Sequence, residues 1–142
     1  TIWAMNKEKI SVEDLQTRIS NFIERAQSSK DSVQFSFDFN TKQAPDFIFT
    51  SIEGVNIYRV IQEAVNNALK YAEAQNIQVT MQVWDADQFK VAVVDDGNGF
   101  DLKNHQQGNG LGNMKKRAQD IGATLQIETQ LTQGTRVILQ SK

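Results

Sequence analysis

A helical segment with two contrasting faces constrains this chain more than any other feature. Residues 56–72 read NIYRVIQEAVNNALKYA, and at about 100° per residue one side of this helix is apolar while a wedge of roughly 60° on the other side is polar. Carboxylate, amide and ammonium groups on one face suit a hard cation and phosphate oxygens. From this helix alone, a solvated polar face fits equally well. The apolar side holds Ile61, Ala64, Val65, Ala68, Leu69 and Ala72, and the polar wedge holds Glu63, Asn66, Asn67 and Lys70.

The composition limits the classes of function that remain. The chain has 142 residues, of which 39% are apolar and 23% charged, so it is large enough for one domain with a hydrophobic core. Its net charge of -2 argues against a broad electrostatic attraction to nucleic acid or to an anionic membrane. We therefore expect neither nucleic-acid binding nor direct membrane contact, and any phosphate must be bound by local groups.

Metal and redox chemistry are also restricted. The sequence contains no cysteine, which excludes disulfides, thiol chemistry and Cys-ligated metals. Its single histidine, His105, argues against a His-based zinc site. The sequence has no apolar run of about 18 residues, which a membrane-spanning helix would require.

Hydrophobic periodicity predicts an α/β sheet layered with three helices, in which most strand pairs are antiparallel. Ser11 is suited to cap the first helix, Thr50 or Ser51 the second, and Gly122 to end the third. Residues 40–46, which hold the only proline, are predicted as a loop. The predicted helices are 11–28, 56–72 and 111–121, and the predicted strands are 33–39, 47–49, 77–84, 89–94, 124–128 and 135–139.

Two glycine clusters flank a polar segment without periodicity. They are DDGNG at residues 95–99 and GNGLGN at residues 108–113. Glycines one residue apart let a backbone approach a ligand closely, and the second cluster opens a helix whose free N–H groups suit an anion. Neither cluster is a Rossmann fingerprint or a P-loop. Asp95 ends a buried strand, where a carboxylate is costly unless it meets a specific donor such as the exocyclic amine of a purine.

Together these motifs resemble the ATP-binding domain shared by gyrase, Hsp90, histidine kinases and MutL, which is called the Bergerat fold. Within this superfamily, the chain looks like the catalytic domain of bacterial two-component sensor histidine kinases of the nitrate-sensor type. Four motifs stand in the expected order over residues 55–139, namely QEAVNNALKYA, DDGNGF, GNGLGN and the pair Gly134-Thr135. The resemblance implies an α/β (α+β) two-layer sandwich whose mixed, mostly antiparallel sheet is covered on one face by three helices.

The resemblance also implies a role for the polar residues of the central helix. Asn67 resembles the amide that ligates Mg²⁺, and Glu63 resembles the acid that orients or deprotonates the attacking group. Lys70 looks like the residue that contacts phosphate, and Tyr71, where relatives often carry histidine, would lie near the sugar or base. Asn66 shares the wedge, but nothing in the motif requires it.

The glycine motifs imply the rest of the nucleotide site. Asp95 resembles the carboxylate that accepts from the adenine amine, and Thr135 is similar to the threonine that supports it through water. Gly97 and Gly99 would shape that pocket, and residues 100–110 would form a short ATP lid. The hinge and phosphate cradle of the lid would be Gly108, Gly110 and Gly112, with Leu111 among the nucleotide-binding residues.

The implied function is transfer of the γ-phosphoryl group of ATP–Mg²⁺ to a histidine on a separate dimerisation domain. Residues 10–142 would form the catalytic domain. Residues 1–9, with the apolar cluster IWAM, would be the remnant of a linker from the upstream dimerisation and phosphoacceptor domain; a terminus folded back onto the domain is the alternative. We interpret His105 as an ordinary exposed histidine in the lid. The expected partners are that domain and a cognate response regulator, in the cytoplasm and in a membrane-anchored parent protein.

Other functions of the same fold stay open. One is an ATPase or an anti-sigma-type serine kinase, which Glu63 slightly favours because a carboxylate can activate water. The compact chain with its short lid argues against a gyrase-like or chaperone ATPase. Another is a non-catalytic nucleotide-sensing or partner-docking module, against which the Glu63–Asn67 pair argues.

Overall fold

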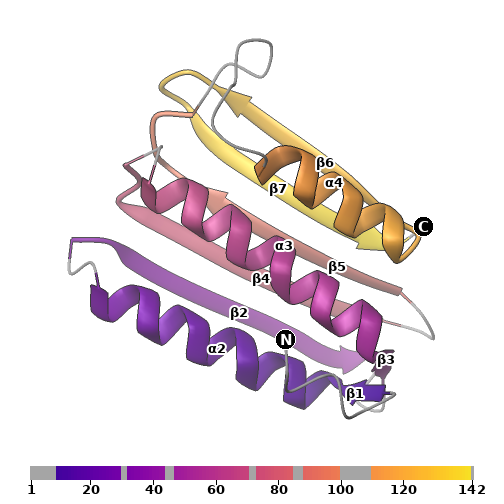
Figure 1. Ribbon diagram of the computed structural model, residues 1–142. Helices are drawn as coiled ribbons and strands as arrows, with labels where there is room; N and C mark the ends of the chain where they lie inside the picture. Colours follow the sequence, from indigo (N-terminus) through magenta and orange to yellow (C-terminus); the bar gives the residue numbers. More distant parts are fainter. Residues whose placement is uncertain are drawn as a thin grey trace.

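The computed structural model describes residues 9–29, 32–43, 47–70, 73–84, 88–99 and 110–141. In this part of the chain, three helices lie against one face of a five-stranded sheet, so that the molecule has two layers (Figure 1). The predicted two-layer α/β sandwich is therefore confirmed. The helices are α2 (Val12–Ser29), α3 (Ser51–Lys70) and α4 (Gly110–Asp120).

The sheet is mixed and mostly antiparallel. Its strands are β2 (Gln34–Gln43), β4 (Asn76–Trp84), β5 (Gln88–Asp95), β6 (Ala123–Gln130) and β7 (Gly134–Ser141). They are ordered β2-β4-β5-β7-β6, with β2 parallel to β4 and every other neighbouring pair antiparallel. A separate two-stranded sheet consists of β1 (Lys9–Ser11) and β3 (Ile48–Thr50), so Lys9, the last residue of the predicted linker, begins β1.

Strand alternation directs apolar side chains toward the helices. In β5, Phe89, Val91 and Val93 are buried, whereas the residues between them are partly exposed. Burying one such side chain contributes about 1.5–3 kcal/mol, so packing on the sheet fixes α3 more strongly than helix propensity does. The apolar side of α3 is buried as predicted at Ile61, Ala64, Val65 and Ala68.

The helix ends confirm the predicted caps. The N–H of Asp14 donates to Ser11 Oγ at 3.0 Å at the start of α2. At the start of α3, the N–H of Glu53 donates to Thr50 Oγ1 at 3.1 Å, and the N–H of Thr50 donates to Glu53 Oε1 at 2.9 Å. This reciprocal capping box satisfies two backbone donors that helix geometry leaves unpaired. Gly122, with φ of 65°, follows α4 as expected.

The structure differs from the prediction around residues 40–46. β2 continues to Gln43, so residues 40–43 extend the strand and are not a loop. Their polar side chains resemble a loop in sequence, but β2 is an edge strand, where polar residues are common. The short strand β1 was not predicted, because three residues are too few to show alternation. Residues 44–46 of the predicted loop, residues 71–72 of the predicted helix and residues 85–87 between the predicted strands 77–84 and 89–94 lie outside the described residues.

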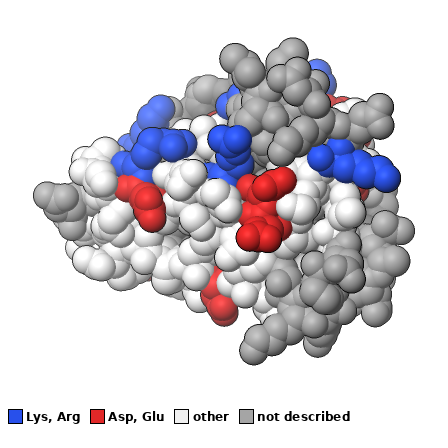
Figure 2. Space-filling view, turned by 90° about the horizontal axis from the view of Figure 1, so that it is seen from below, with Lys and Arg blue, Asp and Glu red and all other residues white. Residues whose placement is uncertain are grey.

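The described surface carries both signs of charge. On the face shown in Figure 2, Lys and Arg side chains lie among Asp and Glu side chains. Arg136 and Glu128 form an ion pair at 4.0 Å in which the side chains are 55% and 50% exposed. Such exposed pairs contribute at most about 1 kcal/mol, so they do not determine the fold. None of the described helices has the length and apolar character needed to span a membrane.

Candidate functional site

The polar wedge of α3 is arranged as predicted. Glu63 and Asn67 lie one helical turn apart and are half-buried, as is Asn66, and Lys70 is exposed at the end of α3. Side chains four residues apart on a helix are neighbours, so one ligand can contact both Glu63 and Asn67. α4 packs beside α3 and runs in the opposite direction (Figure 1).

Asp95 is a buried carboxylate at the end of β5. It is 7% exposed, and alternation places it on the helix-covered face of the sheet with Val91 and Val93. The N–H of Gly97 donates to Asp95 Oδ1 at 2.8 Å. The turn after β5 therefore holds one carboxylate oxygen, and the carboxylate has a second oxygen with which to accept from a ligand.

Two cavities adjoin Asp95. One, of about 560 Å³, is lined by Asp95 and the β6–β7 hairpin, including Thr129 and Thr135; Val94 and Arg136, on the helix-free side of the sheet, also line it, and no residue of α3 does. The other, of about 390 Å³, is lined by Asp95, Asp96 and the first residues of β2 and β4. Figure 1 shows the end of β5, the β6–β7 turn and the carboxy-terminal end of α3 at the same end of the molecule. The fold thus brings Asp95 and the wedge of α3 to a common end.

Thr135 lies opposite Asp95 on the neighbouring strand and is 8% exposed. Its Oγ1 is 2.9 Å from the Oγ1 of Thr129, and Thr129 Oγ1 also donates to the carbonyl of Gly134 at 3.3 Å. Because a hydroxyl has one proton, Thr135 is then the donor in the pair. Thr129 was not predicted as a site residue, since only the pairing of β6 with β7 places it opposite Thr135.

Gly99 and Gly134 bring two turns into close contact. Their φ angles are 64° and 84°, a region that favours glycine. A Cβ on Gly99 would overlap the carbonyl of Gln130, and a Cβ on Gly134 would overlap the carbonyl of Asp95. Gly99 therefore packs against the β6–β7 turn, and Gly134 packs against the residue that carries the buried carboxylate.

We expect Gly134→Ala to destabilise the fold by about 2–3 kcal/mol, because it adds a steric overlap to the cost of a left-handed alanine. Gly122→Ala is the matched control: Gly122 has φ of 65°, but its Cβ would meet no described atom within 4 Å. The control should cost only about 1 kcal/mol. Urea unfolding of both variants measures the difference, and equal losses would contradict the packing at Gly134.

Asp95 and Asp96 should titrate on opposite sides of their ordinary pKa of 3.8. Burial is the main cause that raises the pKa of Asp95, and the charge of Asp96 adds to it, whereas backbone N–H groups of Gly97 and Thr135 oppose it. Hydrogen bonds from the side chain and backbone of Asn76 lower the pKa of Asp96. NMR titration of the carboxyl carbons should find Asp95 above 3.8 and Asp96 below it; the reverse order would contradict both environments.

These shifts have opposite consequences for stability. Protonated Asp95 is favoured in the folded state, so its contribution to stability is present below pH 3.8 and is lost as the pH rises through its raised pKa. The contribution of Asp96 is present above pH 3.8 and is lost as the pH falls through its lowered pKa. A ligand amine needs the ionised Asp95 as acceptor, so its binding should weaken as the pH falls through the raised pKa.

The glycine cluster before α4 is described only from Gly110 onward. Gly110 begins α4, and it is followed by half-buried Leu111 and exposed Gly112. A Cβ on Gly112 would meet no described atom within 4 Å, so contacts with the described residues do not require a glycine there. Tyr71, Gly108 and residues 100–109 of the predicted lid, including His105, lie outside the described residues.

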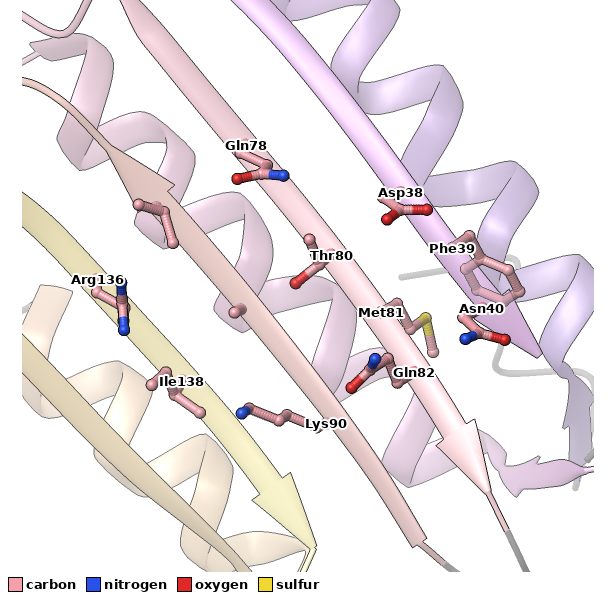
Figure 3. A pocket seen from close by; sticks show the side chains of 12 residues that line it. Asp38, Phe39, Asn40, Gln78, Thr80, Met81, Gln82, Lys90, Arg136 and Ile138 are labelled. Carbon is pink, nitrogen blue, oxygen red and sulfur yellow. The ribbon is translucent and has the colours of Figure 1, made fainter. Parts of the chain in front are cut away.

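A concavity of about 450 Å³ lies on the helix-free face of the sheet (Figure 3). Figure 3 shows polar side chains such as Asp38, Gln78, Lys90 and Arg136 around it, on four strands of the sheet. None of its lining residues is among the predicted site residues. We therefore place the candidate site on the other face, at Asp95 and α3.

Comparison with known families identifies the family to which the chain belongs. Residues 53–142, which include most of α3 together with Asp95 and Thr135, match the family described as "Histidine kinase-, DNA gyrase B-, and HSP90-like ATPase". The matched segment is more than half of the chain, and the chain belongs to this family.

Solved structures of histidine kinases share the fold. The histidine kinase domain of a blue-light activated kinase from Erythrobacter litoralis EL346 has 19% identity and a TM-score of 0.72 over 95% of this chain. The ATP-binding domain of PrrB from Mycobacterium tuberculosis has 19% identity and a TM-score of 0.67, covering 94% of each chain. Full-length ShkA, in complex with AMPPNP, has 15% identity and a TM-score of 0.72 over 97% of this chain.

The chain spans only part of several of these proteins. It covers 64% of the Erythrobacter litoralis domain, 41% of the longer chain of the same kinase and 32% of ShkA. The likeness therefore concerns one domain of larger proteins. The predicted nitrate-sensor subtype stays a prediction.

Proposed function

We propose that this domain binds ATP–Mg²⁺ and donates the γ-phosphoryl group to a histidine on a separate dimerisation domain. The observation that carries the proposal is the buried carboxylate of Asp95, which has no Lys or Arg partner among the described residues and lies at the same end of the fold as the polar wedge of α3 (Figure 1). Membership of a family of ATPases that includes histidine kinases supports it, as does the AMPPNP complex of the similar ShkA.

The environment of Asp95 suits the adenine amine. A buried carboxylate is costly unless it is paired, and among the described residues Asp95 has no ion pair with Lys or Arg. Its charge is compensated by backbone N–H groups, which leaves room for one more donor. An exocyclic amine is such a donor, whereas a carbonyl oxygen at the same position would face the carboxylate with a second acceptor.

The wedge of α3 suits the phosphates and their metal. Asn67 supplies an amide oxygen, and Mg²⁺ keeps several waters and needs few protein ligands, so one such residue fits the ion. When bound, Mg²⁺ neutralises charge on the phosphate oxygens. We assign Glu63 to orient the attacking group and the exposed Lys70 to contact phosphate. Phosphoryl transfer depends on such positioning more than on covalent help from the protein.

The acceptor is proposed to lie outside this chain. A histidine kinase phosphorylates an imidazole on a dimeric helical domain, and the single histidine of this chain, His105, belongs to the predicted lid. A response regulator would then receive the phosphoryl group. The proposed parent protein is a membrane-anchored sensor whose catalytic domain works in the cytoplasm.

Calorimetric titration tests the nucleotide assignment. With Mg²⁺ present, ATP should bind at one saturable site, and inosine triphosphate, in which a carbonyl oxygen replaces the amine, should bind at least about tenfold more weakly. Absence of saturable ATP binding would contradict the proposal. Equal affinity for the two nucleotides would contradict the role of Asp95.

A further inference from the structure

Asp96, the residue after the proposed adenine-binding carboxylate, joins the ends of two strands. Its Oδ1 accepts from the backbone N–H groups of Gln75 at 2.9 Å and Asn76 at 2.8 Å. Its Oδ2 accepts from Asn76 Nδ2 at 2.7 Å, and its own N–H donates to the carbonyl of Asn76 at 3.2 Å. Four hydrogen bonds thus hold the start of the turn after β5 against the start of β4.

The segment to which Asp96 is bound is itself fixed to the framework. The carbonyl of Gln75 accepts from the N–H of Gln34, the first residue of β2, at 2.8 Å. The N–H of Ala74 donates to the carbonyl of Ala68 in α3 at 3.2 Å. The hydrogen bonds of Asp96 therefore set the position of the turn after β5 relative to β2, β4 and α3.

We propose that Asp96 is a positioning residue that orients the Asp95 carboxylate for the purine amine. The connection runs through Gly97, whose N–H donates to Asp95 Oδ1 and whose place in the turn depends on where Asp96 is held. The inference rests on the proposed function, which gave Asp96 no role. Because the Asp96 side chain is exposed, its hydrogen bonds compete with water and its contribution to stability is small, so its main effect should be on nucleotide discrimination.

The ratio of the affinities for ATP and inosine triphosphate measures this effect. The two nucleotides share the ribose and the triphosphate and differ in the base, where a carbonyl oxygen replaces the amine and N1 carries a proton, so contributions from phosphate and Mg²⁺ cancel in the ratio. A displaced Asp95 carboxylate should lower the affinity for ATP and leave the affinity for inosine triphosphate nearly unchanged. A residue with a merely structural role would change both affinities alike.

Two conservative variants separate geometry from charge. Asp96→Asn removes the charge but keeps an oxygen for both backbone N–H groups, and the Asn76 amide can rotate to accept from the new NH₂ group. Asp96→Glu keeps the charge but adds a methylene, so the same donors are reached only if the turn moves. We expect Asp96→Asn to keep the ratio of the two affinities within about threefold of wild type. Asp96→Glu should lower this ratio at least about fivefold, since displacing a contact by about 1 Å can reduce activity by more than that.

Controls make each outcome decisive. Asp38→Asn and Asp38→Glu are the matched control pair, because Asp38 is exposed on the helix-free face of the sheet, opposite Asp95 and α3. Both variants should keep the wild-type ratio. Thermal unfolding should show that all variants are folded at the assay temperature. The proposal is overturned if Asp96→Glu prefers ATP to inosine triphosphate as strongly as Asp96→Asn does. It is also overturned if Asp96→Glu prefers ATP more strongly, which is the result expected if the charge of Asp96 were the cause.

The same titrations distinguish this inference from the proposed function. If the wild-type chain does not bind ATP at a saturable site, the proposed function itself fails, and if it binds ATP and inosine triphosphate equally, the role of Asp95 fails and the role of Asp96 fails with it. If the wild type prefers ATP, Asp95→Asn removes that preference, and the two Asp96 variants behave alike, only the role of Asp96 fails.

Discussion

Asp95→Asn should weaken ATP binding by about 100-fold and leave the fold intact, because it removes a hydrogen bond to a charged group. The oxygen of the new amide can still accept from the N–H of Gly97, as Asp95 Oδ1 does now. Its NH₂ group would then face the adenine amine, which sets two donors against each other. Calorimetric titration with ATP in the presence of Mg²⁺ measures the loss.

Two further measurements test whether the weaker binding comes from the loss of a negative charge or from unfolding. Asp38→Asn removes one carboxylate from an exposed position on the opposite face of the sheet, and its ATP affinity should stay within about twofold of wild type. At neutral pH, Asp95→Asn should unfold at the same temperature as wild type or higher, because burial disfavours the ionised carboxylate. An unchanged ATP affinity in Asp95→Asn would rule out our assignment of the adenine contact.

Asn67→Ala should reduce the rate of phosphoryl transfer by about 1000-fold, because the proposed metal contact stabilises charge on the transferring group. The helix should tolerate the change, since alanine has the higher helix propensity and Asn67 is only half-buried. Transfer is measured with labelled ATP over a range of Mg²⁺ concentrations. The variant should require more Mg²⁺ to reach its own maximal rate.

Asn66→Ala is the matched control for Asn67→Ala. The two amides are adjacent on α3, they are both half-buried, and they carry the same functional group. Only Asn67 has a proposed ligand, so Asn66→Ala should stay within about threefold of the wild-type rate. If the two variants lose the same fraction of the transfer rate, the loss is not specific to Asn67. That result would contradict the proposed contact between Asn67 and Mg²⁺.

The central helix could be predicted because its information is local. The apolar side of α3 and its polar wedge follow from the spacing of residues on one helix, and the cap formed by Thr50 and Glu53 is a pattern over four residues. Asp95 could be singled out for a similar reason, because a carboxylate at the end of an apolar strand is costly to bury unless a donor pairs with it. Periodicity and local chemistry are sufficient for such features.

Features that depend on pairing between distant segments could not be predicted. The polar extension of β2 to Gln43 is a strand because it pairs with β4, and its composition alone resembles a loop. Thr129 acquires its contact with Thr135 only through the register of β6 and β7. The contacts of Asp96 with Asn76 join residues 20 positions apart, and no motif marks them.

Phosphoryl transfer in trans tests the central claim most directly. The chain is incubated with Mg²⁺ and ATP labelled at the γ-phosphate, alone and with the proposed dimerisation domain of the proposed parent protein, produced separately. We expect acid-labile label on the histidine of the dimerisation domain and none on this chain. Label on His105, or release of phosphate without any labelled protein, would contradict the proposed function.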